Sequence, residues 1–258
     1  MLFINPPFGN YLNIKNTIPI RGSFTLYERK GLVVNIFKSL RYSFFCGGWV
    51  NKIGLRNKGI DYAIKTYQKG EIISIAILKE SDINTLIEKI PDNMDIEINV
   101  SCPNTDKSLI NDGLSRFIND KRDWCIVKLS PVCDNRLIDK YYKEGFRQFH
   151  CSNTLPIRYG GLSGPSLIPY TTRIVKYIKT AYPDTIVIAG GGVRNVRQAN
   201  KYLDLGADHI SASTLFFNPI LSWVFLRDFL PKKKSLKKVS KKSLQKKSPK
   251  KVSKKRLP

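Results

Sequence analysis

Residues 185–192, Thr-Ile-Val-Ile-Ala-Gly-Gly-Gly, join a short β-branched apolar run directly to three glycines. A run of this length and composition is typical of a strand buried on both faces, as in a parallel sheet. Helical periodicity follows over residues 196–203, so the segment predicts one βα unit. Glycines at the carboxyl end of such a strand let backbone N–H groups approach an anion, which indicates a phosphate-binding loop.

The same alternation of strand and helix repeats six times from Glu71 onward, which predicts parallel βα units. Two more candidate strands, residues 2–5 and 18–24, bring the number to the eight that close a barrel. Only residues 6–17 separate these two, whereas parallel neighbours are usually joined through a helix. The expected fold class is therefore α/β, a TIM (β/α)8 barrel with an eroded first βα unit. Its six later strands are expected at 72–78, 96–101, 125–129, 148–151, 185–189 and 209–212, and their helices near 82–89, 113–119, 136–143, 171–180, 196–203 and 220–229.

Charge divides the chain into two parts. The formal net charge is +24, but residues 231–258 alone carry 14 Lys and Arg and no acidic residue. Such a segment cannot bury enough apolar surface to offset its ordering entropy and its own repulsion. The predicted domains are a barrel at residues 1–230 and a disordered basic C-terminal tail at residues 231–258.

The tail is a loose repeat of Lys-Lys-x-Ser units, and residues 248–251, Ser-Pro-Lys-Lys, resemble elements of linker-histone tails. Its charge favours nonspecific nucleic-acid binding through phosphate contacts, or nuclear targeting. Phosphorylation of its serines would reduce that charge. A simple solubilising tail is the alternative.

The cysteines and the hydropathy of the chain indicate the cellular compartment of the protein. Five cysteines are scattered without a C-x-x-C pair, so we expect no metal site and a reducing compartment. No apolar run is long enough to span a bilayer, and the amino terminus does not resemble a signal peptide. The expected location is the cytoplasm, without membrane contact. Packing roles are expected for Cys125, Cys133, Cys151, His150 and His209.

Polar and glycine-rich clusters follow the expected strands, where a TIM barrel places its active site. Lys128 stands in a strand that otherwise looks buried, and a buried lysine is costly unless it has a partner. Cys102 lies in a Ser-Cys-Pro-Asn-Thr context that favours a functional role over packing. The clusters are 99–105, 128–131, 151–154, 160–165, 190–192 and 211–214.

Two of these clusters, Asn-Val-Ser-Cys-Pro-Asn at 99–104 and Gly-Gly-Leu-Ser-Gly-Pro at 160–165, resemble those of dihydroorotate dehydrogenases in order and spacing. Residues 51–57, Asn-Lys-Ile-Gly-Leu-Arg-Asn, are similar to the family's substrate-binding loop, and residues 22–25 to its second-strand segment. The resemblance covers residues 18–229. It implies an FMN-dependent oxidoreductase that converts dihydroorotate to orotate in pyrimidine biosynthesis.

The resemblance also implies roles for single residues. Cys102 would be the base that removes a proton, as in the soluble class of the family. Lys128 would contact the flavin ring and stabilise negative charge on it when it is reduced. Substrate binding would fall to Asn51, Gly54, Leu55, Asn99, Asn104, Asn153 and Thr154. The cofactor would be held by Gly22, Ser23, Asn99, Lys128, Ser163, Gly164, Gly191, Gly192, Ser213 and Thr214.

The amino-terminal part departs from the family pattern. Bulkier residues at 7–13 replace the small-residue turn after the first strand. Gly22 stands where the soluble class has a lysine, with Arg21 beside it and Lys15 upstream. These changes bear on one side of the flavin pocket and leave turnover and the true substrate open. The cysteine-using class suggests a soluble electron acceptor such as fumarate, and a homodimer is compatible with the sequence.

Two alternatives stay open from the sequence. A tRNA dihydrouridine synthase is another FMN barrel with a catalytic cysteine, and a basic tail would suit it. The cluster at 160–165 and the absence of a folded tRNA-binding domain after Phe229 argue against that function. A catalytically degenerate barrel that serves as a scaffold for the tail would explain the eroded first unit. The intact polar clusters argue against it.

Overall fold

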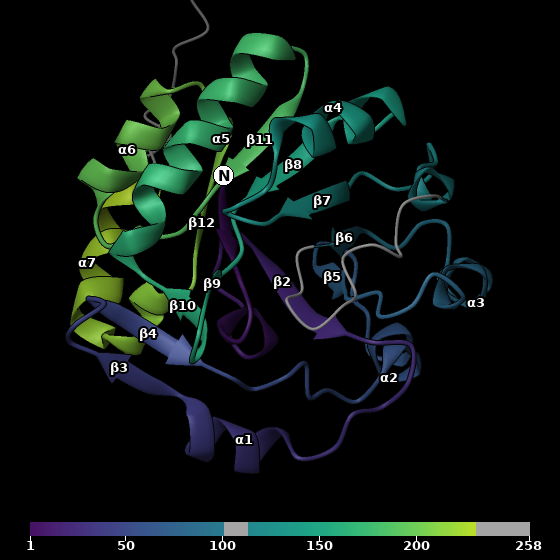
Figure 1. Cartoon of the computed structure of the whole chain (residues 1–258), viewed down its shortest axis with the longest axis horizontal. Coiled ribbons are helices and arrows are strands. Elements are labelled where there is room, and N and C mark those ends of the chain that lie inside the picture. The colour runs from purple at the N-terminus through teal and green to yellow at the C-terminus, as the bar shows by residue number, and fades with distance from the viewer. Residues whose placement is uncertain (101–112, 231–258) are drawn as a thin grey trace, which may run out of the picture.

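The computed structural model describes residues 1–100 and 113–230. Eight parallel strands close a barrel in the order β1-β12-β11-β8-β7-β6-β5-β2, with helices on the outside (Figure 1). The expected TIM (β/α)8 barrel is thereby confirmed. The strands are β1 (Leu2–Ile4), β2 (Thr17–Phe24), β5 (Ile72–Ile75), β6 (Ile96–Asn99), β7 (Cys125–Leu129), β8 (Gln148–Cys151), β11 (Ile186–Ala189) and β12 (His209–Ala212).

The outer helices follow the expected positions closely. Asp134, Asn195 and Asn218 each begin a helix by accepting a hydrogen bond from a backbone N–H of its first turn. No helix within the described ranges is both long and apolar enough to cross a membrane. The helices at expected positions are α3 (Asp82–Lys89), α4 (Asn135–Lys143), α5 (Ile168–Ala181), α6 (Val196–Asp204) and α7 (Pro219–Phe229). A further helix, α2 (Ile60–Lys65), was not predicted.

One expected helix has a different form. The segment predicted as a helix at 113–119 contains only a short 3-10 helix, η2 (Leu114–Phe117). Its two buried residues, Leu114 and Phe117, are three positions apart, which suits the three-residue turn of a 3-10 helix. The chain is already extended at Ile118, so no further turn forms.

The first βα unit lacks its helix, as the sequence indicated. The connection from β1 to β2 contains one short 3-10 helix, η1 (Phe8–Asn10). This connection packs tightly on the barrel, because a Cβ atom at Gly9 would lie 2.1 Å from the Ile20 carbonyl oxygen. Two parallel strands are thus joined without a covering helix on this side.

A second sheet was not predicted. It has four strands in the order β3-β4-β10-β9, with β4 and β10 paired antiparallel (Figure 1). The cluster at 160–165, for which no strand was predicted, forms strand β10, Gly164 and the first residue of a 3-10 helix. The pairing joins segments more than 100 residues apart, so local periodicity carries no signal for it. The elements are α1 (Leu32–Ser39), β3 (Arg41–Ser43), β4 (Gly48–Asn51), β9 (Leu155–Ile157), β10 (Gly160–Ser163) and the 3-10 helix η3 (Pro165–Leu167).

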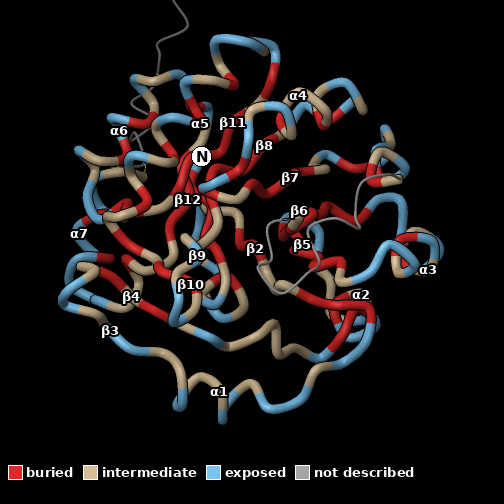
Figure 2. The backbone as a smooth tube through the Cα atoms, viewed as in Figure 1, coloured by how far each residue is buried: buried red, intermediate tan, exposed pale blue. Residues whose placement is uncertain are grey.

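The interior of the barrel is layered, and its strands are the most buried part of the chain (Figure 2). Side chains two positions apart on a strand point to the same side, so Ile72 and Ser74 share one side of β5, and Ile126 and Lys128 one side of β7. The layer nearer the amino ends is apolar: Phe3, Ile20, Ile72, Ile126 and Ile188. The next layer is buried but polar: Ser74, Glu97, Lys128, His150 and Ser211.

Candidate functional site

Glu97 lies at the centre of the polar layer and is fully buried. Its Oε1 accepts hydrogen bonds from Lys128 Nζ at 3.1 Å and from Ser74 Oγ at 2.8 Å, while its Oε2 pairs with His150 Nδ1. Burial alone would raise the pKa of the Glu97 carboxyl, but the positive charge of Lys128 and the bonds from His150 and Ser74 outweigh it and lower the pKa to about 2. Glu97 is therefore a carboxylate that balances the buried lysine.

His150 continues the chain of hydrogen bonds to the opposite side of the barrel. Burial, with the nearby Lys128, lowers its pKa despite the carboxylate of Glu97, so the ring is neutral near pH 7. His150 Nε2 lies 2.7 Å from Ser211 Oγ, which lies 3.1 Å from Asn5 Nδ2. The Oδ1 atom of Asn5 is buried and has no hydrogen-bond partner in the described chain.

A second chain of hydrogen bonds leads from the same carboxylate to the barrel mouth. Ser74 Oγ lies 2.9 Å from Ser23 Oγ, and Asn99 Nδ2 donates to Ser23 Oγ at 3.1 Å. Asn153 Nδ2 donates to Asn99 Oδ1 at 3.1 Å, and the Thr154 backbone N–H donates to Asn153 Oδ1 at 2.9 Å. Five predicted site residues thus belong to one connected network: Ser23, Asn99, Lys128, Asn153 and Thr154.

A narrow cavity of about 80 Å³ opens above this network. Its walls come from the carboxyl ends of β1, β7, β8 and β12 and from the loops after β10 and β11, as expected for a TIM barrel. Asn5 and Lys128 contribute to its lining. The predicted site residues that the structure brings together here are Lys128, Asn153, Thr154, Ser163, Gly164, Gly191, Gly192, Ser213 and Thr214.

The glycines after β11 are required by their backbone and by close packing. Gly191 and Gly192 have φ values of +85° and +74°, in the left-handed region that favours glycine. A Cβ atom at Gly192 would lie 2.6 Å from Ile168 Cγ1, and one at Gly191 would lie 2.9 Å from Leu167 Cβ. The triple glycine thus brings the backbone of this turn against η3 and the start of α5, beside the cavity.

Other predicted site residues do not line the cavity or lie outside the residues that the structure describes. Asn51, Gly54 and Leu55 do not line it, although β4 carries Asn51 into the small sheet opposite Gly161. Cys102 and Asn104 lie outside the described residues.

The position of Gly22 cannot hold a lysine in this backbone. Its φ is +121°, and a Cβ atom there would lie 2.5 Å from the Ser74 carbonyl oxygen. Arg21 does not substitute either, because its guanidinium pairs with Glu71 and donates to the Thr66 carbonyl oxygen at 2.9 Å. Lys128 is therefore the cation of this cavity within the described lining.

Three other cysteines, Cys125, Cys133 and Cys151, are poor nucleophiles. Burial raises the pKa of Cys125 to about 12 and that of Cys133 to about 11, and it raises the pKa of the fully buried Cys151 as well. Their thiols stay protonated near neutral pH, which agrees with the packing roles expected for them.

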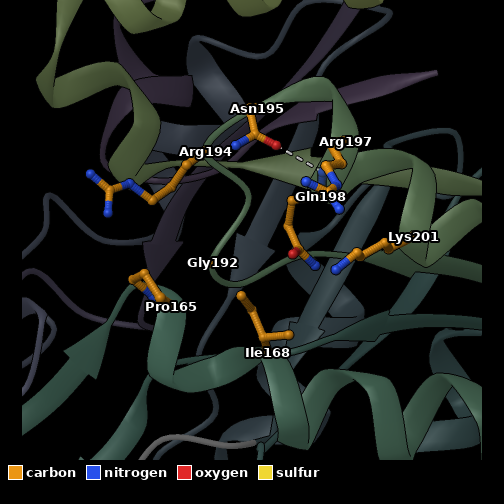
Figure 3. A pocket seen from close by; sticks show the side chains of 8 residues that line it. All are labelled: Pro165, Ile168, Gly192, Arg194, Asn195, Arg197, Gln198 and Lys201. Atoms are coloured by element: carbon orange, nitrogen blue, oxygen red, sulfur yellow. Dashed lines mark hydrogen bonds between the residues drawn. The ribbon is translucent and has the colours of Figure 1, made fainter.

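A larger hollow, of about 340 Å³, shares Gly192 with the first cavity. Figure 3 shows the residues that line the larger hollow. Arg194, Arg197 and Lys201 line it from α6 and the turn before that helix, and all three are exposed. Gly192 alone among the predicted site residues reaches this hollow. The smaller cavity is the candidate site because the buried network and the predicted residues converge on it.

The sequence indicated no role for Glu97 or Asn5, it marked Ser211 only as part of the cluster at 211–214, and it predicted a packing role for His150. A signal was present for Glu97, because an acidic residue in the same buried strand pattern as Asn99 needs a cation. That cation is Lys128, which follows the buried Ile126 by two positions on the neighbouring strand β7. No local pattern connects Asn5 with Ser211, since 206 residues separate them.

No family model matches the chain. Relatives do match over most of its length. The catalytic subunit of dihydroorotate dehydrogenase B (NAD(+)) from Thermotoga petrophila is 28% identical over 268 residues, covering 85% of this chain and 94% of that protein. The protein of the same name from Petrotoga mobilis is 30% identical over 230 residues, covering 76% of this chain and 75% of that protein.

A solved structure supports the fold independently. The crystal structure of DHODH from Eimeria tenella in complex with ferulenol superposes with a TM-score of 0.65 at 18% identity, over 81% of this chain and 72% of that one. The barrel fold and the extent of the sequence match point to the same family. The chain belongs to the dihydroorotate dehydrogenase family.

Proposed function

We propose that this chain is an FMN-dependent oxidoreductase of the dihydroorotate dehydrogenase type, which converts dihydroorotate to orotate. The observation that carries the proposal is the position of Lys128: a buried ammonium, balanced by Glu97, lines the cavity on which nine predicted site residues converge. The relatives named above are dihydroorotate dehydrogenases, which are oxidoreductases acting on CH–CH bonds.

The groups around the cavity suit FMN chemically. Backbone N–H groups of a glycine turn and nearby hydroxyls suit a phosphate and a polyol chain. The Lys128 ammonium suits a ring that gains negative charge on reduction. Asn5 Oδ1 suits an N–H or O–H donor. We assign the phosphate and ribityl side to Ser163, Gly164, Gly191, Gly192, Ser213 and Thr214, and the ring side to Lys128, Asn99, Gly22 and Ser23.

Substrate binding is proposed for the amides at the mouth of the barrel. Asn99 and Asn153 are held by hydrogen bonds to each other and to Ser23, so their side chains are oriented before a ligand arrives. Thr154 adjoins them. Asn51, at the end of β4, and Gly54 and Leu55, in the loop after it, would add contacts to the substrate. Asn104, which lies outside the described residues, would add another.

The reaction removes a proton and a hydride from adjacent ring carbons. Cys102 would take the proton as a thiolate, while bound FMN would accept the hydride. Lys128 would stabilise the negative charge that results. Within the described chain, the raised pKa values of Cys125, Cys133 and Cys151 leave them unsuited to this role.

The direct test is the visible absorbance of the purified protein, followed by anaerobic addition of dihydroorotate. We expect a flavin spectrum that bleaches as dihydroorotate is oxidised. A colourless protein that shows no thermal shift with FMN would contradict cofactor binding. A flavin spectrum that dihydroorotate does not bleach would retain the cofactor and contradict the substrate.

The basic segment at 231–258, which lies outside the described residues, is proposed as a separate unit that binds nucleic acid nonspecifically. Its 14 positive charges in 28 residues carry this proposal. Each phosphate contact on a duplex gives a slope of about −0.9 in log K against log salt. Deleting 231–258 should abolish DNA binding in fluorescence anisotropy and leave flavin content unchanged. Equal affinity with and without the segment would contradict the proposal.

A further inference from the structure

One residue that lines the cavity carries a buried polar atom without a partner in the described chain. Asn5 is 9% exposed, it lines the cavity, and its Oδ1 makes no hydrogen bond within the described chain. Buried polar side-chain atoms are satisfied in the large majority of cases, so an unsatisfied one beside a cavity indicates a missing donor.

The network determines which way the Asn5 amide faces. The ionised Glu97 can only accept, so the hydrogen bond from His150 must come from Nδ1–H. The neutral ring then has a lone pair on Nε2, which accepts from the Ser211 hydroxyl at 2.7 Å. Ser211 Oγ accepts in turn from Asn5 Nδ2 at 3.1 Å. The NH2 group of Asn5 is thereby committed, and its Oδ1 remains as an acceptor.

The backbone around Asn5 is held as firmly as its side chain. The Asn5 N–H donates to the Ala212 carbonyl oxygen at 2.9 Å, which extends the pairing of β1 with β12. The next carbonyl, that of Pro6, accepts from the Ser213 hydroxyl at 2.9 Å. Both Ala212 and Ser213 line the same cavity. The acceptor is therefore preorganised relative to the wall of the pocket.

We propose that Asn5 is a cofactor-contacting residue, whose Oδ1 accepts a hydrogen bond from an N–H or O–H donor of the bound flavin. Glu97, His150 and Ser211 act as positioning residues for it, because they orient the amide. The inference rests on the proposed function. It adds a contact from the side of the pocket where the chain departs from its family and where Gly22 contributes no side chain.

The test compares Asn5→Leu with the wild type and with Ser222→Ala as a matched control. Ser222 is a buried polar residue of α7 whose hydroxyl donates to the Leu215 and Asn218 carbonyl oxygens, outside the cavity. We expect Asn5→Leu to weaken FMN binding about five- to tenfold, as for one lost hydrogen bond, in titrations of flavin fluorescence. Its ligand-free Tm should fall no more than that of Ser222→Ala.

The outcomes separate the inference from the proposed function. A wild-type protein that binds no FMN would overturn both. A wild type that binds FMN beside an Asn5→Leu variant with unchanged affinity would overturn only the inference, and a lower Tm in that variant would then assign Asn5 a structural role. If Asn5→Leu does not fold, Asn5→Ser takes its place, since its shorter side chain cannot place an oxygen at the Oδ1 position.

Two further measurements identify the donor and the tautomer. The first is the affinity for lumiflavin, which lacks the ribityl chain. If the donor is a ring N–H, Asn5→Leu should bind lumiflavin more weakly than the wild type does. If the donor is a ribityl hydroxyl, the two proteins should bind lumiflavin equally well. Nitrogen NMR of the ligand-free protein should show His150 protonated on Nδ1 and unprotonated on Nε2 near pH 7. A His150 ring that is protonated on Nε2 would overturn the inference.

Discussion

The two sides of the pocket are built differently. On the side formed by β7, β8, β11 and β12, the strands are followed by α4, α5, α6 and α7, and nearly every residue singled out in the sequence reaches the cavity. On the side formed by β1 and β2, no α-helix joins the strands, Gly22 has no room for a side chain, and Arg21 is paired elsewhere. The difference indicates that binding groups concentrate at the ends of the strands that an α-helix follows. On the side of β1 and β2, the main polar side chain that lines the cavity is Asn5.

The largest effect is expected on the chemistry itself. Cys102→Ala should leave FMN bound but slow flavin reduction by dihydroorotate by about 10² to 10⁴, the usual contribution of a general base. Cys125→Ala is the matched control, because burial raises the pKa of Cys125 to about 12 and keeps it protonated. Anaerobic stopped-flow measures both rates. Equal bleaching in Cys102→Ala and the wild type would remove Cys102 from the mechanism.

Removing Lys128, the cation on the side of β7, β8, β11 and β12, should lower both the stability of the protein and its affinity for FMN. Lys128→Met leaves the Glu97 carboxylate buried without its ammonium, and breaking a buried pair costs about 3–5 kcal/mol. The double variant Lys128→Met with Glu97→Gln should recover part of the stability but not FMN affinity. Urea unfolding and flavin titration test the pair. Full recovery of FMN affinity in the double variant would contradict a direct role for Lys128.

The turn after β11 can be tested by substituting Gly192, with Gly70 as the matched control. Gly192→Ala should lower stability and weaken FMN binding by about 1–3 kcal/mol, because its φ is +74° and the new Cβ would meet Ile168 at 2.6 Å. Gly70 also has a positive φ, +99°, but open space around it. Gly70→Ala should therefore show the backbone cost alone and leave FMN binding unchanged. Equal losses of FMN affinity in both variants would argue that packing of the turn does not matter.

The opposite side is tested by restoring a side chain at Gly22. Gly22→Lys should not improve flavin binding or turnover, because its φ of +121° and the Ser74 carbonyl oxygen at 2.5 Å exclude a Cβ atom. We expect a loss of stability of about 1–3 kcal/mol. Thermal unfolding and FMN titration are the measurements. A stable variant with tighter FMN binding would show that the difference between the two sides is not set by this backbone.

The network that joins the two sides predicts a pH dependence of stability. The folded-state pKa of His150 lies below its usual 6.5, so the unfolded chain binds a proton that the folded chain does not. The free energy of unfolding should therefore fall as the pH decreases below about 6.5, by at most about 1.4 kcal/mol per pH unit from this residue. Glu97, with its pKa lowered to about 2, adds to the loss only below about pH 4.5.

His209 provides the control for this measurement, because its pKa is also lowered, mainly by burial. His150→Gln and His209→Gln should each remove one part of the slope between pH 6.5 and 5 in urea unfolding. A slope that His150→Gln leaves unchanged would mean that His150 binds as many protons in the folded chain as in the unfolded one. Folding would then not lower its pKa, against the neutral ring on which the hydrogen-bond directions inferred for Asn5 depend.

The sequence by itself determined the barrel, the eroded first unit and most of the cavity. Each of these depends on local patterns: apolar strands alternate with amphipathic helices, and glycines or hydroxyls follow the strands where a parallel barrel places its mouth. Lys128 could be singled out from its own strand, because a buried charge requires a partner. The division at residue 230 and the roles of all the predicted site residues, Cys102 and Asn104 among them, stay predictions.

Only the tertiary structure decided what depends on distant pairs. The small sheet joins β4 to β10, and the polar network joins Asn5 to Ser211 and Glu97 to both Lys128 and His150. Such contacts form when the barrel closes and brings β1 beside β12, so no window along the sequence contains them. Barrel closure places a buried carboxylate where its hydrogen bonds orient the amides on both sides of the pocket.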